Sequence, residues 1–196
     1  MKMLKNIILF SYNLIVSLIA LPFAVILILM GKLAIYASSY SEVSLIASKI
    51  PFLLGQKIRF YYYKATLNHL GEKVVFMYGS FCQYPNASIG DRVHIGYYNA
   101  IGDVIIGNDV IVGGFVNFIS GTNQHSYEDP TQKISIQKAA GRSTINIGSD
   151  VWIGSNAVIA ASIGDRCVIG AGSVLVKSAE EHSIYAGNPA KLIKKI

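Results

Sequence analysis

The chain of 196 residues is long enough to bury one core, but 52% hydrophobic residues is a high fraction for a soluble domain of this size. It carries 17 Lys and Arg against 11 Asp and Glu, and seven of these bases lie in residues 1–64, where Glu42 is the only acid. Because these bases flank apolar segments and form no basic stripe, the charge does not indicate nucleic-acid binding. It favours an anionic lipid surface.

The first expected element is a long apolar helix. Residues 6–31 contain no charged side chain, and a helix needs about 20 such residues to cross the ~30 Å hydrocarbon core. The segment is too long for the apolar part of a signal peptide, so we expect a retained membrane anchor. Pro22 interrupts it, which leaves one kinked span or a re-entrant hairpin with both ends in the cytoplasm. The basic flanks favour the hairpin, with its break near Pro22, or a shallow re-entrant helix.

The next segment, residues 33–64, predicts a helix lying along the bilayer, with a break at KIPFLLG. Its RFYYYK run, residues 59–64, sets tyrosines between bases, as at a membrane interface. A packed tyrosine-rich helix would show the same pattern, so both readings stay open. We therefore expect residues 1–64 to form a membrane-anchoring helical region that contacts lipids.

A six-residue repeat occupies the chain from Ala87 onward, with an aliphatic residue usually followed by glycine. A helix repeats at 3.6 residues and a half-buried strand at 2, so this period predicts the short strands and corners of a parallel β-helix. Two steps are shorter, five residues from Ile101 to Ile106 and four from Ile159 to Ile163, and their corners should be tightened or distorted. The aliphatic positions are Ile89, Ile95, Ile101, Ile106, Val112, Phe118, Ile147, Ile153, Ile159, Ile163, Ile169 and Leu175.

The interior of this repeat should be lined by a second set of mostly small or aliphatic residues, two positions before the first set. Glycine should supply corner conformations that a Cβ would oppose. Cys82 and Cys167 have neither metal-ligand nor CxxC spacing, so we expect reduced thiols in the core.

The repeat and the segments NIGSDVWIGSNAVI, IGAGSVLVK and YAGNPAKLIKKI resemble the hexapeptide-repeat, left-handed β-helix acyltransferases. The similarity is strongest to the galactoside, maltose and xenobiotic O-acetyltransferase branch, and it covers about residues 72–196. It implies an all-β left-handed parallel β-helix over residues 65–196, preceded by the α-helical membrane-anchoring region. It also implies a catalytic loop over residues 120–144, a C-terminal tail over 177–196, and a homotrimer with its sites between subunits.

The repeat stops for about 25 residues between Ile119 and Ile145, too long for a corner and typical of a functional loop. Of the four histidines, only His125 lies in it. In the resembled family this loop reaches a neighbouring subunit and carries the catalytic histidine. Histidine can deprotonate a hydroxyl at neutral pH, so we interpret His125 as the general base. Glu128 and Asp129 are candidates to orient it.

The resemblance implies further site residues. They are Asn117 for binding the acceptor, and Trp152, Ser155, Ala171, Lys177, Lys191 and Lys194 for binding acetyl-CoA, the expected acyl donor. Asn117 could instead be an inward-stacked amide, and the last two lysines solvated tail charges. A pantetheine chain can lie along β-helix backbone, and lysines suit its phosphates. No metal site is expected, because the zinc carbonic anhydrases of this fold need three converging histidines.

These features predict a membrane-associated O-acetyltransferase that moves an acetyl group from acetyl-CoA to a sugar hydroxyl of a surface or lipid-linked glycan. An anchor suits an acceptor held at the membrane. Since acetyl-CoA is a cytoplasmic metabolite, we expect the bacterial inner membrane, with the catalytic domain facing the cytoplasm. Two alternatives remain: an acyltransferase acting on a lipid or amino-sugar acceptor, and a non-catalytic trimeric membrane scaffold.

Overall fold

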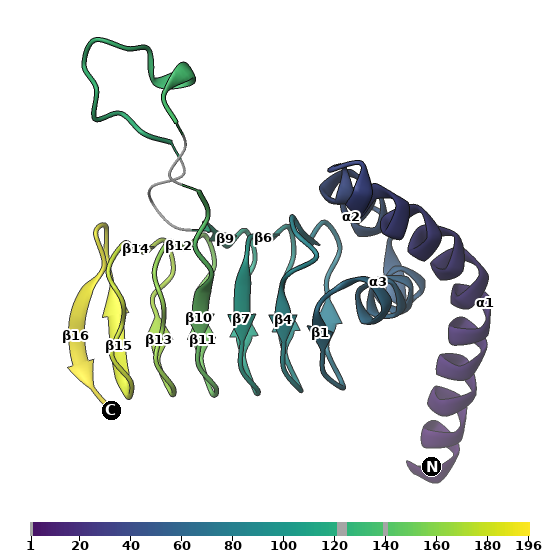
Figure 1. The fold of residues 1–196 in the computed structure, drawn as a ribbon. Coiled ribbons are helices and arrows are strands. Elements are labelled where there is room, and N and C mark those ends of the chain that lie inside the picture. Colours follow the sequence, from purple (N-terminus) through teal and green to yellow (C-terminus); the bar gives the residue numbers. More distant parts are fainter. Residues whose placement is uncertain (1, 121–124, 139–140) are drawn as a thin grey trace.

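The computed structural model describes residues 2–120, 125–138 and 141–196. Three helices are followed by a column of short strands (Figure 1). The helices are α1 (Lys2–Tyr36), α2 (Tyr40–Ser48) and α3 (Phe52–Thr66), and the loop contains one 3-10 turn, η1 (Ile134–Ile136).

Three sheets form the walls of the column, with strand orders β1-β4-β7-β10, β16-β15-β13-β11-β8-β5-β2 and β14-β12-β9-β6-β3. The first sheet contains β1 (His69–Leu70), β4 (Ser88–Ile89), β7 (Val104–Ile106) and β10 (Ile145–Ile147). The second contains β2 (Val75–Phe76), β5 (His94–Ile95), β8 (Ile111–Val112), β11 (Trp152–Ile153), β13 (Val168–Ile169), β15 (Ser183–Ala186) and β16 (Lys191–Lys195). The third contains β3 (Phe81–Cys82), β6 (Ala100–Ile101), β9 (Asn117–Phe118), β12 (Val158–Ile159) and β14 (Val174–Leu175).

Successive strands along the chain pass from sheet to sheet, and each pairs in parallel with a strand of the neighbouring coil, as Ile95 does with Val112. The pair β15 and β16 is antiparallel. The structure therefore confirms the predicted parallel β-helix, preceded by a helical region.

The residues of the six-residue repeat fill the inside of the column. All twelve predicted aliphatic positions are at most 3% exposed, and burying such a side chain contributes about 1.5–3 kcal/mol. Both cysteines are free and buried, as predicted, and burial raises the pKa of the Cys82 and Cys167 thiols. The outward-facing residues next to the aliphatic positions of the repeat, such as Ile105 and Ile111, are about half exposed. Each strand therefore alternates between buried and exposed side chains.

The four-residue step distorts the column as predicted. Ile163 pairs with Ile147 and Ala179 only through isolated bridges. Ala161, expected inside, is partly exposed, while Ala160 is buried. Two residues removed from the repeat shift the inward phase by one position at this corner.

The first coil begins earlier than the repeat was detected. Leu70, Phe76 and Cys82 follow each other at six-residue spacing and are at most 2% exposed. No glycine follows Phe76 or Cys82, so the pattern lacked its clearest marker there.

The repeat glycines are required for a different reason from the predicted one. Gly96 and Gly113 do not have positive φ, and non-glycine residues such as Tyr98 (φ 57°) and Phe115 (φ 59°) occupy the left-handed corner positions. A Cβ on Gly96 would lie 2.5 Å from the carbonyl oxygen of Gly113, and one on Gly113 would lie 2.6 Å from the amide nitrogen of Ser155. The glycines therefore allow close stacking of successive coils.

Helices α2 and α3 close the N-terminal end of the column. Tyr63 is fully buried, and its ring centroid lies 4.4 Å from that of Phe76. Its hydroxyl hydrogen-bonds with Ser44 Oγ at 2.8 Å, and the backbone amide of Cys82 donates to both oxygens, at 3.1 and 3.2 Å. The RFYYYK run is therefore a packed tyrosine-rich helix, and its alternative as a membrane-interface belt is wrong.

Arg59 joins α2, α3 and the first coil. Its side chain is buried, with Nε donating to the carbonyl oxygen of Phe76 at 3.0 Å and Nη1 to that of Ile50 at 2.8 Å. Nη1 also donates to the Ala47 carbonyl near the end of α2, where the helix dipole favours a cation. Burial lowers the pKa of Arg59. The helix predicted to lie along the bilayer over residues 33–64 is thus corrected: α2 and α3 pack against the column.

Helix α1 is continuous over 35 residues and passes through Pro22. The predicted hairpin break near this proline is therefore wrong. The span Met3–Tyr36 is long and apolar enough to cross a membrane, and 22% of its most apolar window is buried. It packs beside α3 and lies across the end of the column (Figure 1).

Candidate functional site

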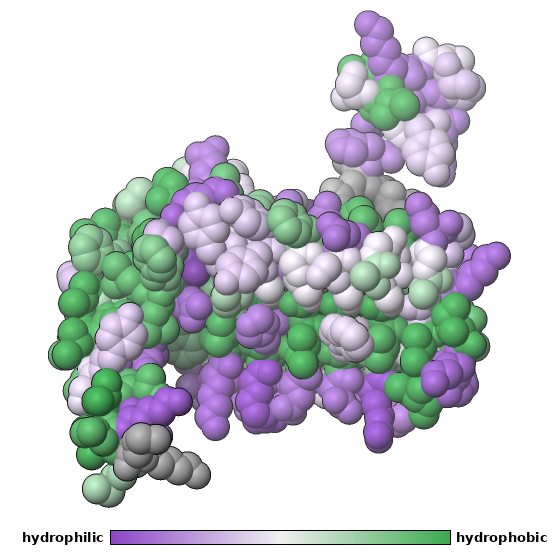
Figure 2. All heavy atoms as spheres, turned by 180° about the vertical axis from the view of Figure 1, so that it is seen from behind, coloured by the Kyte–Doolittle hydropathy of each residue, from purple (hydrophilic) through white to green (hydrophobic). Residues whose placement is uncertain are grey.

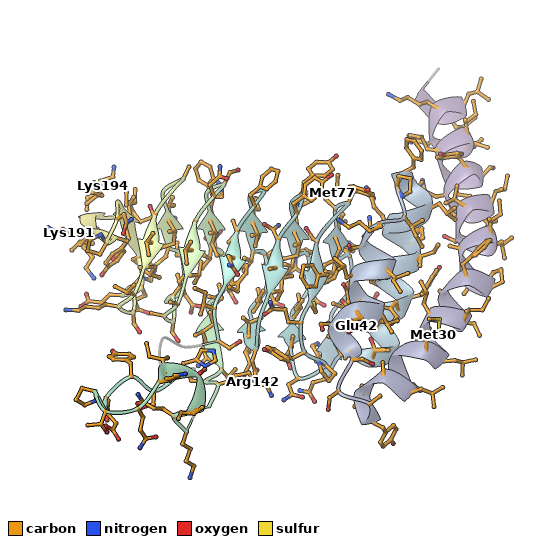
Figure 3. All side chains as sticks on the ribbon, turned by 90° about the horizontal axis from the view of Figure 1, so that it is seen from above. Met30, Glu42, Met77, Arg142, Lys191 and Lys194 are labelled. Atoms are coloured by element: carbon orange, nitrogen blue, oxygen red, sulfur yellow. The ribbon has the colours of Figure 1, made fainter. Side chains whose placement is uncertain are left out.

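A loop projects from the column between β9 and β10, where the repeat is interrupted (Figure 1). Its returning end is fixed by two contacts. Thr144 Oγ1 donates to Asp103 Oδ1 at 3.1 Å, and the Arg142 guanidinium carbon lies 3.9 Å from the centre of the Tyr84 ring. Arg142 is labelled where the loop meets the column in Figure 3. The loop therefore returns to a fixed point, at the corner between the third and first sheets.

The predicted general base, His125, is exposed in this loop. Next to it, Ser126 Oγ donates to Gln137 Oε1 at 3.2 Å, and Gln137 Nε2 donates to the Asp129 carbonyl at 2.8 Å. Gln137 thus connects the His125 segment to the far side of the loop. Sequence reasoning missed it, because only the loop conformation brings these residues together. Part of the predicted loop, residues 121–124 and 139–140, lies outside the described residues.

Asp129 is engaged within its own turn. Its Oδ1 accepts from the Thr131 hydroxyl at 2.6 Å and from the Thr131 amide at 2.9 Å, while Oδ2 accepts from Gln132 Nε2 at 2.7 Å. These hydrogen bonds, led by the Thr131 hydroxyl, hold the pKa of Asp129 below its ordinary value. Asp129 therefore stabilises an Asx-type turn. Glu128, the other candidate for orienting His125, is exposed.

Asn117, predicted to bind the acceptor, is exposed on β9, shortly before the chain enters the loop. The alternative of an inward-stacked amide is wrong for this residue. The buried amide is Asn99, one coil earlier, whose Nδ2 donates to the Gly113 carbonyl at 2.9 Å and whose Oδ1 accepts from the Val116 amide at 2.6 Å. Its position two residues before Ile101, an inward position of the repeat, was the signal that could have identified it.

Ser155 and Ala171 stack in one corner, between the second and third sheets. The Gly172 amide donates to the Ser155 carbonyl at 2.8 Å, and Ser155 Oγ accepts from the Gly114 amide at 3.2 Å. Among the residues that the structure describes, no large side chain covers this part of the corner: Ala171 is exposed, and a Cβ at Gly172 would meet nothing within 4 Å. The chemistry of the corner fits an extended amide chain such as pantetheine.

The remaining predicted residues are exposed near the C-terminal half of the column. Trp152 on β11 is 56% exposed. Lys191 and Lys194 lie on β16 at the end of the column (Figure 3), and Lys177 follows β14. Within one chain the structure thus stacks Ser155 on the coil of Ala171 and gathers two lysines at the C-terminal end. The histidine loop leaves from a different corner.

Three hollows of about 380, 250 and 360 Å³ lie at the helical end or beside the loop base, and none is lined by a predicted site residue. A cleft formed between two subunits has only one wall in a single chain, so it would not be enclosed here. The positions of these hollows therefore do not argue against the predicted site.

Comparison with known proteins identifies the repeat. The family described as "Hexapeptide repeat of succinyl-transferase" matches residues 144–177. A "Probable macrolide acetyltransferase" of Lysinibacillus sphaericus is 38% identical over 115 residues, which cover 50% of this chain and 64% of that protein. The "Putative lipopolysaccharide biosynthesis O-acetyl transferase WbbJ" of Escherichia coli (strain K12) is 36% identical over 117 residues, covering 56% and 58%. The chain thus spans less than two thirds of either relative.

Among solved structures, the hexapeptide-repeat-containing acetyltransferase VCA0836 from Vibrio cholerae has the same fold, with a TM-score of 0.67 and 22% identity over 82% of this chain and 92% of that one. A second structure of VCA0836, complexed with acetyl coenzyme A, matches with a TM-score of 0.59 and 21% identity over 83% of this chain and 87% of that one. Repeat, fold and relatives agree: the chain carries the hexapeptide repeat and is similar in sequence and fold to acetyltransferases that contain it.

Proposed function

We propose that this protein is a membrane-associated O-acetyltransferase that moves an acetyl group from acetyl-CoA to a sugar hydroxyl of a surface or lipid-linked glycan. The observation that carries the proposal is His125, exposed on a loop at the break of a β-helix whose relatives are named acetyltransferases. The name of WbbJ supports a glycan acceptor, and the VCA0836 complex supports acetyl-CoA as the donor.

In the proposed reaction His125 accepts the proton of the acceptor hydroxyl while the hydroxyl oxygen bonds to the carbonyl carbon of the thioester. The carbon–sulfur bond then breaks, and the departing sulfur takes the proton back from the imidazolium. The products are an acetyl ester and coenzyme A, so protons balance. Asn117, exposed at the entry to the loop, would hold the acceptor.

Donor binding is assigned to the corner and the C-terminal edge. Ser155 and Ala171 would carry the pantetheine chain, and Trp152 would contact the same donor. The lysines would meet its phosphates; they are Lys177, Lys191 and Lys194. Lys195 Nζ is already paired with a Glu180 carboxylate oxygen at 2.6 Å, so Lys195 is not assigned to the donor phosphates.

The proposal extends to assembly and location. The His125 loop and the donor corner lie at different corners of the column within one chain. A homotrimer would bring them together by placing the loop of one subunit against the donor corner of the next. Within the helical region of residues 1–64, α1 would anchor the protein to lipids of the bacterial inner membrane. Residues 65–196, with the loop at 120–144 and the tail at 177–196, would form the catalytic domain facing the cytoplasm.

The test is transfer of labelled acetyl from acetyl-CoA to lipid-linked glycans in membranes containing the protein, with the label located by mass spectrometry. His125→Ala should reduce turnover by about 100-fold or more, with little change in acetyl-CoA affinity. Lys133→Ala, on an exposed side chain of the same loop, is the control and should stay within about threefold. Label on a lipid or amino sugar would replace the glycan as acceptor, and no label anywhere would support the scaffold alternative.

A further inference from the structure

Helix α1 contacts the rest of the protein through one narrow stripe. Its buried residues recur at spacings of three and four, which places them on one face. They are Val16, Ala20, Ala24, Leu27, Gly31 and Ala34. The stripe packs closely on α3, since a Cβ on Gly31 would lie 2.7 Å from the Tyr62 ring. The C-terminal half of α1 is therefore fixed against a folded neighbour.

The same face continues toward the N-terminus with polar residues. Asn6, Asn13 and Ser17 extend the spacing of the stripe, and Asn13 and Ser17 are partly buried. Asn13 lines a hollow of about 380 Å³ together with Lys57 of α3 and Lys73 of the first coil. The polar side of α1 thus points toward the column, where two cationic side chains lie.

These neighbours limit how α1 can meet a bilayer. From Asn13 to Ala34 the helix runs beside α3 and the first coil for about 32 Å, at 1.5 Å per residue. A perpendicular crossing by this part would carry Lys57 and the folded chain into hydrocarbon, where a charged lysine is strongly unfavourable. Residues 3–12 reach only about 15 Å, half of the ~30 Å hydrocarbon core.

The opposite face of α1 is apolar along most of its length. Its large hydrophobic residues, each at least 42% exposed, include Leu4, Ile7, Ile8, Leu14, Ile15, Leu18, Leu21, Val25, Ile26, Leu29 and Leu33. No charge lies between Lys5 and Lys32. Figure 2 shows apolar side chains gathered over this end of the molecule. A surface that binds a protein partner normally has a polar rim around its apolar centre. A long apolar face with basic residues at its ends instead suits a membrane, where the apolar side chains contact lipid tails and the bases contact anionic headgroups.

We propose that α1 lies in the plane of the membrane, with this outer face in a single leaflet, and does not cross the bilayer. Because α1 lies across the end of the column (Figure 1), the column would stand on the membrane surface, with Lys5 and Lys32 near the headgroups. Both ends of α1 would then remain on the side of the column. The proposal shares membrane association with the proposed function but does not depend on the reaction.

Two neighbouring substitutions separate in-plane binding from crossing. Asn13→Glu and Leu14→Glu place a carboxylate at the same depth of a crossing helix, but on opposite faces of an in-plane one. The full chain is floated with vesicles of phosphatidylethanolamine and phosphatidylglycerol, and circular dichroism and an oligomeric state unchanged from that of the unsubstituted protein confirm folding. Leu14→Glu should weaken vesicle binding about tenfold or more, and Asn13→Glu should change it less than about twofold. Equal losses would support crossing, and no loss in either would exclude lipid as the occupant.

A depth measurement gives a second test on the same vesicles. Spin labels at Leu4→Cys, Leu18→Cys and Leu29→Cys, all on the outer face, report depth through their accessibility to oxygen and to a water-soluble nickel complex. In-plane binding predicts similar depths, within about 10 Å of the headgroups. A crossing helix would place Leu18 near the bilayer centre and the other two near opposite surfaces, which would overturn the proposal. Neither test measures acetyl transfer, so each can fail without affecting the proposed function.

Discussion

The two ends of the molecule bury their surfaces by different means. In the column, repeated positions stack in register, so Ile95 lies on Val112 and the close approach depends on glycines such as Gly96. At the helical end there is no repeat, and single residues join distant segments, as Tyr63 does with the Cys82 amide and Arg59 with the Phe76 carbonyl. The column is stabilised by the same stacking contact repeated in every coil, and the helical end by a few individual contacts.

The largest test of this contrast is truncation. Removing residues 1–38 should leave a folded protein, because α2 and α3 still cover the first coil. Removing residues 1–66 should abolish soluble folding, because it exposes the apolar side chains of Leu70, Phe76 and Cys82 and frees the Cys82 amide. Soluble yield and cooperative thermal unfolding measure the outcome, and equal behaviour of both truncations would contradict a structural role for α2 and α3.

The same contrast explains what the sequence could predict. The inward positions of the column followed from a six-residue period, because each coil repeats the environment of the last. Ser155 and Ala171 fell in one corner for the same reason, being 16 residues and one coil apart. The first coil escaped detection because Phe76 and Cys82 lack the following glycine.

The packing of the helical end could not be predicted from a sequence period. A tyrosine between two bases has the same local sequence pattern whether it faces lipid or a protein core. For Tyr63 it is the tertiary contact with Phe76 that shows that the ring packs in the core. The continuity of α1 through Pro22 also depends on its neighbours, since packing on α3 offsets the hydrogen bond that proline removes. In the loop, Gln137 lies 11 residues from Ser126, its hydrogen-bond partner, and no period links them.

A glycine pair in the column provides the next test. A Cβ on Gly113 would lie 2.6 Å from the Ser155 backbone nitrogen, whereas one on the adjacent Gly114 would lie 3.3 Å from the Tyr97 carbonyl. Gly113→Ala should therefore cost about 3 kcal/mol or more of unfolding free energy, because backbone must move, and Gly114→Ala about 1 kcal/mol or less. Denaturant unfolding compares the two. Similar costs would mean that coil spacing adjusts more easily than the structure indicates.

At the helical end the matched test is the loss of one hydroxyl. Tyr63→Phe removes one of the two hydrogen-bond partners of Ser44 Oγ and one of the two acceptors of the Cys82 amide in the buried interface, so it should cost about 1–2 kcal/mol. Tyr61→Phe, on a partly buried side chain of the same helix, should change stability by less than about 0.5 kcal/mol. Both values come from denaturant unfolding of the purified protein. Equal effects would show that the Tyr63 hydroxyl is not a specific link between α3 and the column.

The smallest expected effect lies at the opposite edge of the column and concerns binding. Lys194 and Lys195 are adjacent on β16, but Lys195 Nζ is paired with Glu180 at 2.6 Å, on exposed side chains where such a pair contributes little stability. If Lys194 meets a phosphate of acetyl-CoA, Lys194→Ala should raise KM for acetyl-CoA roughly three- to tenfold with kcat nearly unchanged, because the contact is the same in the ground and transition states. Lys195→Ala should leave both constants within about twofold. Raising the salt concentration should shrink the difference between the two variants, since the contact is exposed. A KM change in Lys195→Ala but not in Lys194→Ala would move the phosphate contact to the other face of β16.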